Sequence, residues 1–122
     1  MAARSTLQRR GDWAEQRALR LLGSRGWTLH SRQWRCRWGE LDLVLSKPQR
    51  LLLVEVKARS RCGPDGWGQA SLGPRKRLRL QRAWSCWLEA HPAWADCPVE
   101  LVYALVALPP SRRAVRWIHV SF

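Results

Sequence analysis

Apolar residues recur along this chain at two different spacings. Over residues 12–22 they lie three and four positions apart, the spacing of one face of an α-helix, and Gly23 follows as a stop. The same spacing recurs over residues 74–90, where Pro74 occupies a position that favours the first turn of a helix. The pattern therefore predicts two amphipathic helices.

Shorter apolar segments, typical of β-strands, follow each predicted helix. They cover residues 27–37, 40–46, 51–58, 99–108 and 114–120. Segment 51–58 is apolar on both faces apart from a few charged positions, so we expect it to be a central strand. The order α-β-β-β-α-β-β predicts a single α/β domain with a central mixed β-sheet flanked by helices.

The chain is long enough for one domain. We expect residues 1–10 to form a flexible basic arm and residues 11–122 to fold, with a glycine-rich loop over residues 59–73. The N-terminus lacks the apolar core of a signal peptide, no apolar run reaches membrane-spanning length, and the four cysteines include no C-x-x-C pair. These features predict a cytoplasmic protein with no membrane partner and no zinc site.

The charge of the chain is strongly basic, with 22 Lys and Arg against nine Asp and Glu and a net charge of +13. Such a charge favours a polyanionic partner, and nucleic acid is the first choice because neutralising its phosphates releases counterions. An anionic membrane surface is second, since no basic amphipathic helix with a clean apolar face stands out. A high net charge also simply keeps a small protein soluble.

Scarce carboxylates nevertheless fall in two neighbouring apolar strands. Glu40 and Asp42 are two positions apart and share one strand face, as do Glu55 and Lys57 in the next strand. The short turn between the strands predicts a hairpin that brings Asp42 beside Glu55. Buried carboxylates need a metal ion or another cation as a partner. With the backbone carbonyl of Val56, this pair predicts an oxygen site for Mg²⁺ or Mn²⁺.

Lys57 would lie beside such a metal, where its ammonium group orients a water nucleophile or stabilises charge on a phosphate. Metal-assisted phosphodiester cleavage needs a Lewis acid, a bound water and a cation near the developing charge. Cross-strand ion pairs on a solvated sheet face are the alternative interpretation. The apolar residues 51–54 weaken that alternative, because they indicate a strand buried on both sides.

The spacing of Asp42 and the Glu55-Val56-Lys57 tripeptide resembles the PD-(D/E)XK motif of restriction-endonuclease-like nucleases. Over about residues 11–120 the chain also resembles the YraN-like family of uncharacterised small bacterial proteins. The matching segments are Gly11-x-x-Ala14-Glu15, Gly26-Trp27, Gly39-Glu40-Leu41-Asp42-Leu43, Val54-Glu55-Val56-Lys57-Ala58-Arg59, Gly68 and Lys76. That family is described as a predicted nuclease or nucleic-acid-binding protein, so catalysis and binding both stay open.

The resemblance implies a restriction-endonuclease-like fold in which Asp42 and Glu55 bind the metal and Lys57 is the catalytic lysine. It implies that Glu15, in the first helix, is an accessory acid of the site. It places Glu40 as a further acid at the edge of the site.

Five further residues are predicted to contact nucleic acid. Lys76 matches a lysine of the family and lies near the start of the second helix, where a phosphate is favoured. The others are Arg75, Arg77, Gln69 and Arg59. The basic run at the start of this helix also fits an ordinary solvated helix face.

Tryptophan is unusually frequent, with nine residues. Three lie near arginines and are candidates to stack on unpaired bases: Trp34, Trp38 and Trp67. Three others lie on predicted core faces: Trp84, Trp87 and Trp117.

The favoured function is a metal-dependent endonuclease that uses Mg²⁺ or Mn²⁺ to cleave DNA, including branched or single-stranded forms. DNA is favoured over RNA. The alternative is a non-catalytic nucleic-acid-binding protein on a nuclease fold, since fold does not determine function. An RNA- or ribosome-associated basic protein is a third hypothesis. A homodimer is a further hypothesis, because many small nucleases dimerise to cut two strands.

Overall fold

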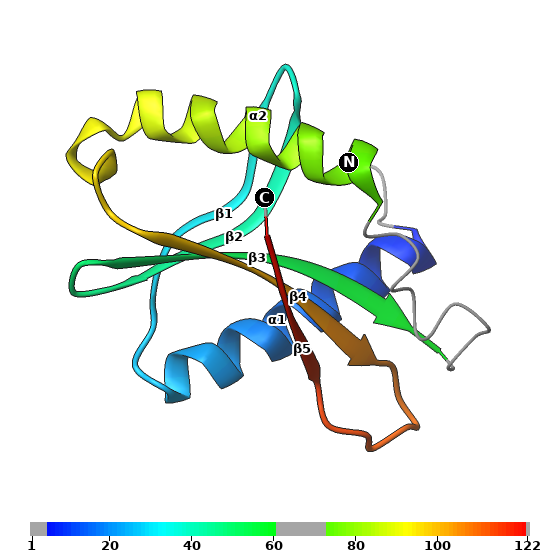
Figure 1. The fold of residues 1–122 in the computed structure, drawn as a ribbon. Helices are drawn as coiled ribbons and strands as arrows, with labels where there is room; N and C mark the ends of the chain where they lie inside the picture. Colours follow the sequence, from blue (N-terminus) through cyan, green and yellow to red (C-terminus); the bar gives the residue numbers. More distant parts are fainter. Residues whose placement is uncertain (1–4, 61–72, 122) are drawn as a thin grey trace.

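The computed structural model describes residues 5–60 and 73–121, which form two long helices and a five-stranded sheet. The elements are α1 (Thr6–Ser24), β1 (Thr28–Cys36), β2 (Gly39–Lys47), β3 (Arg50–Arg59), α2 (Pro74–Ala90), the 3₁₀ turn η2 (Pro92–Trp94), β4 (Val99–Ala107) and β5 (Arg116–Val120). Figure 1 shows α1 and α2 on opposite faces of the sheet. The predicted order and the single α/β domain are confirmed. Within the described residues, no helix has the length and apolar character needed to cross a bilayer.

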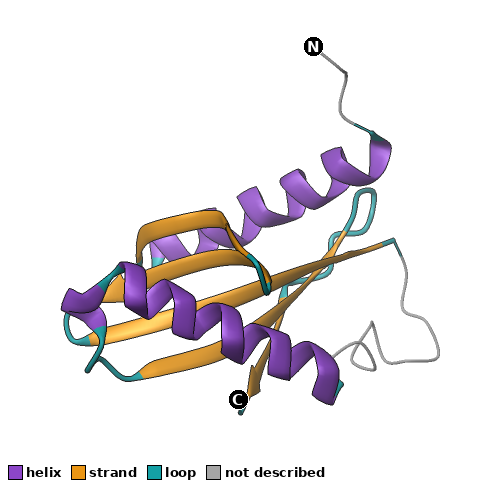
Figure 2. Cartoon of the chain, turned by 90° about the horizontal axis from the view of Figure 1, so that it is seen from above, coloured by secondary structure: helices purple, strands orange, loops and turns teal. Residues whose placement is uncertain are grey.

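The strands lie side by side in the order β1-β2-β3-β4-β5. Strands β1, β2 and β3 are joined antiparallel, as are β4 and β5, whereas β3 and β4 run parallel because the chain crosses over through α2. The sheet is therefore mixed, and β3 is its central strand, as its two apolar faces predicted. Figure 2 shows α2 running along one face of these strands with α1 behind them.

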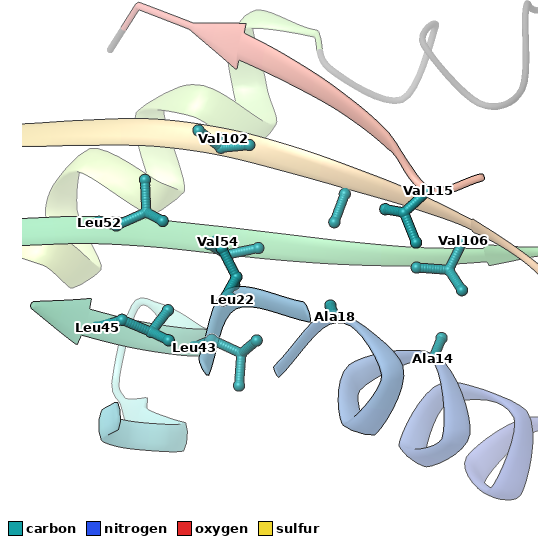
Figure 3. Packing of buried hydrophobic residues seen from close by; sticks show 11 residues of the cluster. Ala14, Ala18, Leu22, Leu43, Leu45, Leu52, Val54, Val102, Val106 and Val115 are labelled. Atoms are coloured by element: carbon teal, nitrogen blue, oxygen red, sulfur yellow. The ribbon is translucent and has the colours of Figure 1, made fainter. Parts of the chain in front are cut away.

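The core consists of one apolar layer under each helix. Under α1, the small residues Ala14 and Ala18 and the larger Leu22 face Leu43 and Val54 of the sheet (Figure 3). They recur every four positions, so one stripe of the helix is buried, and the two alanines allow the helix to approach the sheet closely. The layer under α2 is larger in side-chain volume and contains most of the buried aromatic residues.

The first helix begins earlier than its apolar spacing predicted. It starts at Thr6, so residues 6–10, which the sequence assigned to a flexible arm, are helical, and residues 1–4 lie outside the described part. The cause is a capping box: the Ser5 hydroxyl accepts a hydrogen bond from the Gln8 N–H at 3.1 Å, and the Gln8 side chain accepts one from the Ser5 N–H at 2.7 Å. The Ser-x-x-Gln sequence over residues 5–8 is typical of a capping box and could have predicted this earlier start.

Replacing Ser5 with alanine is expected to lower the free energy of unfolding by about 1 kcal/mol, because an orphan N–H of the first turn loses its acceptor. Urea unfolding measures the change. Ser85→Ala is a matched control, since the Ser85 hydroxyl is exposed and only donates to the Gln81 carbonyl within α2. Equal effects of the two substitutions would contradict the capping role.

Candidate functional site

A cavity of about 320 Å³ lies between α2 and the open end of the β2–β3 hairpin. The sheet side contributes Trp38, Gly39, Glu40, Asp42, Glu55, Val56 and Lys57, and α2 contributes Lys76, Arg79, Leu80 and Ala83. The structure therefore brings together seven residues that the sequence singled out: Trp38, Glu40, Asp42, Glu55, Val56, Lys57 and Lys76. The site lies where the two strands of the hairpin begin to separate.

Where the two strands separate, Asp42 and Glu55 each accept a hydrogen bond from a backbone N–H of the other strand. The backbone pairing of β2 with β3 runs from the turn to the Leu43–Val54 pair. Beyond that pair, the Asp42 N–H donates to Oε2 of Glu55 at 3.1 Å, and the Val56 N–H donates to Oδ2 of Asp42 at 2.8 Å. The two carboxylates thus take the place of backbone carbonyls as acceptors. Their positions are restrained by the backbone on both strands.

Both carboxylates carry a raised pKa. Glu55 is only 2% exposed, and burial, together with the adjacent charge of Asp42, raises its pKa to about 8. Burial also raises the pKa of Asp42 to about 6, while the hydrogen bond from Val56 opposes this shift. Lys76 lies with its Nζ 3.5 Å from Oε1 of Glu55 and offsets part of the charge. A cation between the two carboxylates would favour the ionised form of both.

In the absence of metal ions, the free energy of unfolding is expected to fall as the pH rises from about 5 to about 8. The pKa of Glu55 is about 8 in the folded protein against an ordinary 4.5. The folded state therefore binds more protons than the unfolded state over this range, which makes the slope of stability against pH negative. Glu55→Gln keeps an acceptor for the Asp42 N–H and removes the titration, so its stability should vary less. Urea unfolding in EDTA at several pH values measures both; a wild-type stability that rises over this range would contradict the expectation.

Lys57 reaches the same cavity from β3. Burial lowers its pKa, and the positive charges of Lys76 and Arg59 lower it further. Among the described residues, its ammonium group has no hydrogen-bond partner or ion pair, whereas Lys76 contacts Glu55. Lys57 is therefore a cation that is available to a ligand in the cavity.

Glu15 lies beside the site without lining it. Its carboxylate is mostly buried and accepts hydrogen bonds from Arg32 Nε at 3.3 Å and Gln33 Nε2 at 3.2 Å. Its charge is still close enough to raise the pKa of Asp42. The structure thus places Glu15 as a neighbour whose oxygens are already bound by β1, whereas Glu40 does line the cavity.

Of the residues predicted to contact nucleic acid, Lys76 lines the cavity, whereas Arg75, Arg77 and Arg59 do not. Arg75 is exposed and Arg77 half-buried on α2, and Arg59 faces a separate pocket near the start of α1. Gln69 lies outside the described residues. Arg79 lines the cavity although the sequence did not single it out as a site residue. Arg79 could have been predicted as a site residue, because it follows Lys76 by three positions and such residues are neighbours on one side of a helix.

The residues present fit a hard divalent cation. Asp42 and Glu55 offer carboxylate oxygens, and the carbonyl of Val56, which also lines the cavity, would complete an all-oxygen donor set. Burial is the main cause of the raised pKa of both carboxylates, and a bound cation would oppose it. No three His, Cys, Asp or Glu side chains of the described residues converge on a metal position. A cation held here would therefore complete its shell with water or substrate oxygens, as Mg²⁺ commonly does.

Comparison with known proteins identifies the family of the chain. The model of the uncharacterised protein family UPF0102 matches residues 14–108, which include every residue lining the cavity. The UPF0102 protein P9303_16141 of Prochlorococcus marinus (strain MIT 9303) is 56% identical over 113 residues, covering 93% of this chain and 90% of its own length. The UPF0102 protein PSEEN4497 of Pseudomonas entomophila (strain L48) is 36% identical over 113 residues, covering 92% of this chain and 91% of its own. The chain therefore belongs to the uncharacterised family UPF0102, the YraN-like family that its motifs resemble.

Proposed function

We propose that this protein is a metal-dependent endonuclease that cleaves phosphodiester bonds in DNA. The observation that carries the proposal is the buried pair of Asp42 and Glu55, held by reciprocal hydrogen bonds to the backbone and facing a cavity that also contains Lys57. Burying both carboxyl groups costs stability in a metal-free protein, because each must either take up a proton or stay ionised away from water. Their position beside Lys57, which has no hydrogen-bond or ion-pair partner in the described part of the chain, fits a catalytic cation site better than a structural one.

In the proposed reaction, different residues of the cavity have different roles. Asp42, Glu55 and the Val56 carbonyl would hold Mg²⁺ or Mn²⁺, which supplies Lewis acidity and lowers the pKa of water. Lys57 places its ammonium group beside the scissile phosphate, where it stabilises the charge that develops during attack. Lys76 and Arg79 face the phosphate from α2 and orient the strand.

A non-catalytic nucleic-acid-binding protein is the second candidate, favoured by the net charge of +13. The two functions differ in what the carboxylates do. In a pure binder, Asp42 and Glu55 repel phosphate, so their neutralisation would tighten DNA binding. In a nuclease, the same change removes the metal and abolishes cleavage.

A cleavage assay with Asp42→Asn tests the proposal. Supercoiled, single-stranded and four-way-junction DNA, with RNA for comparison, would be incubated with Mg²⁺, Mn²⁺ or EDTA. Asp96→Asn is the matched control, because Asp96 is an exposed residue between η2 and β4 and undergoes the same chemical change. We expect the wild type and Asp96→Asn to cleave DNA only with metal, and Asp42→Asn to be inactive.

The opposite result would support the second candidate. If no substrate is cleaved with either metal while Asp42→Asn binds DNA as well as or better than the wild type, the nuclease proposal is wrong. Cleavage that persists in Asp42→Asn would also contradict it.

A further inference from the structure

Trp38 is the one aromatic side chain that lines the cavity in the described part of the chain. It lies in the short turn between β1 and β2, where its backbone N–H donates to Sγ of Cys36 at 3.4 Å. Gly39 follows with a φ of 135°, a conformation that glycine adopts without strain. The turn therefore presents the indole at the edge of the cavity.

Two guanidinium groups lie against this indole. The central carbon of Arg37 is 4.8 Å from the ring centroid, and that of Arg82, on α2, is 4.7 Å from it. A guanidinium and a nucleobase are both planar groups that stack on an aromatic face. An arginine that covers the ring can move to a neighbouring phosphate when a base takes its place.

None of the other tryptophans in the described residues lines the cavity, and Trp67 lies outside those residues. The ring of Trp27 also has two cations against it, Lys47 at 4.7 Å and Arg50 at 5.2 Å, but Trp27 does not line the cavity. Trp84 and Trp87 are buried and stack on each other at 5.0 Å, and Trp34 packs edge-on against His91. Trp13 is 39% exposed and has an arginine 5.8 Å from its ring, but it lies on α1, on the opposite side of the sheet. Trp13 is therefore a natural comparison for Trp38.

Three cationic residues on α2 lie in a row between Trp38 and the carboxylates Asp42 and Glu55. Lys76, Arg79 and Arg82 are three residues apart and follow one side of the helix. The first contacts Glu55 and the last covers Trp38. Six residues of helix rise by about 9 Å, so a base on Trp38 and a phosphate at the carboxylates can belong to adjacent parts of one strand.

We propose that Trp38 is a stacking platform for an unpaired nucleobase next to the scissile phosphate, with Arg37, Arg79 and Arg82 binding the flanking phosphates. This inference rests on the proposed nuclease function and specifies its substrate class. A base inside a duplex has neighbours on both faces and has no free face to offer. The site therefore selects DNA with an unpaired nucleotide, as in single strands, gaps and branches, over intact duplex.

Binding measured in EDTA tests the platform without cleavage. Fluorescence anisotropy would compare a labelled single-stranded DNA with a blunt duplex of the same length, at one salt concentration. Trp38→Leu keeps apolar packing and removes the aromatic face, so we expect it to weaken single-strand binding by about five- to hundredfold, the worth of one base–aromatic stack. Duplex binding should stay within about twofold. Trp38→Phe should retain most single-strand binding, and Trp13→Leu all of it.

Photo-crosslinking of the wild type gives a second measurement that does not depend on a variant. A single-stranded DNA carrying 5-iodouracil would be irradiated with the protein, and the adduct mapped by mass spectrometry. We expect the adduct at Trp38. Adducts only at other residues, or equal losses of single-strand and duplex binding in Trp38→Leu, would overturn the platform.

The two proposals can fail separately. If wild-type protein cleaves DNA but Trp38→Leu keeps the same ratio of single-strand to duplex affinity, the platform is wrong and the nuclease stands. If the wild type cleaves nothing but Trp38→Leu loses single-strand binding selectively, the nuclease is wrong and the platform stands.

Discussion

Replacing Lys57 with methionine is expected to slow metal-dependent cleavage by about 10²- to 10³-fold, the cost of removing one donor aimed at a developing charge. Lys57 lines the cavity without a hydrogen-bond or ion-pair partner among the described residues, so we expect its ammonium group to act on bound substrate. Methionine has a similar length and preserves packing. Single-turnover cleavage at saturating DNA measures the chemical step without the binding step.

Lys47→Met is the matched control for this experiment. Lys47 lies at the turn end of β2, away from the cavity, and its Nζ is 4.7 Å from the ring of Trp27. We expect this variant to cleave at the wild-type rate, and Lys57→Met to bind DNA within about threefold of wild type, because one phosphate contact among many contributes little. A Lys57→Met rate equal to that of Lys47→Met would exclude Lys57 from the chemistry.

Replacing Trp87 with alanine is expected to lower the free energy of unfolding by about 3–5 kcal/mol. Trp87 is a fully buried residue of α2 that packs against the sheet and stacks on Trp84 and on His91, with ring centroids 5.0 and 4.0 Å away. Its Nε1 also donates to the Ser31 hydroxyl of β1 at 2.9 Å. Alanine would leave a cavity and remove the donor to the Ser31 hydroxyl, and the loss is large beside the total stability typical of native proteins, about 5–15 kcal/mol.

Urea unfolding of two further variants separates the causes of that loss. Trp87→Phe keeps much of the stacking and removes the hydrogen bond, so its effect should be smaller than that of alanine. Trp13→Ala removes an indole that is 39% exposed and should cost no more than about 1 kcal/mol. Similar losses in Trp13→Ala and Trp87→Ala would contradict the central place of Trp87 in the core.

The central hairpin of the site was predictable from the sequence. Apolar and acidic residues alternate around Asp42, a short turn follows, and the next apolar run carries Glu55 and Lys57. Alternation of apolar and acidic residues, together with a short turn, leaves few ways to pair the two strands. A shift of the pairing by one residue would turn apolar side chains out of the core. In the structure Leu43 pairs with Val54, and this register places Asp42 next to Glu55 as predicted.

The contribution of α2 to the site was harder to predict. Lys76 was expected from the family resemblance, but Arg79 lines the cavity and Arg75 and Arg77 do not. On a helix, only the rotation of the whole element decides which charges face inward. That rotation follows from the packing of Leu80, Ala83, Trp84 and Trp87 against the sheet.

Glu15 shows the same dependence on tertiary contacts. Its helical position was correctly expected, and its charge reaches the site, yet Arg32 and Gln33 of β1 occupy its oxygens. Nothing in the local sequence of α1 specifies those two partners. They become neighbours only because β1 pairs beside β2 and α1, which packs mainly on β3 and β4, also reaches β1.

The sequence alone therefore determined the order of the elements, the central strand and the meeting of Asp42 with Glu55, because each depends on spacing along adjacent segments. Only the tertiary structure decided which cations face the cavity, how far burial raises the pKa of Glu55, and that Trp38 closes the edge of the site. These properties arise where α2 crosses from β3 to β4 and packs back onto the hairpin. The packing of the whole core sets which groups are buried and which distant segments come together. The spacing of apolar residues within one segment does not specify these contacts.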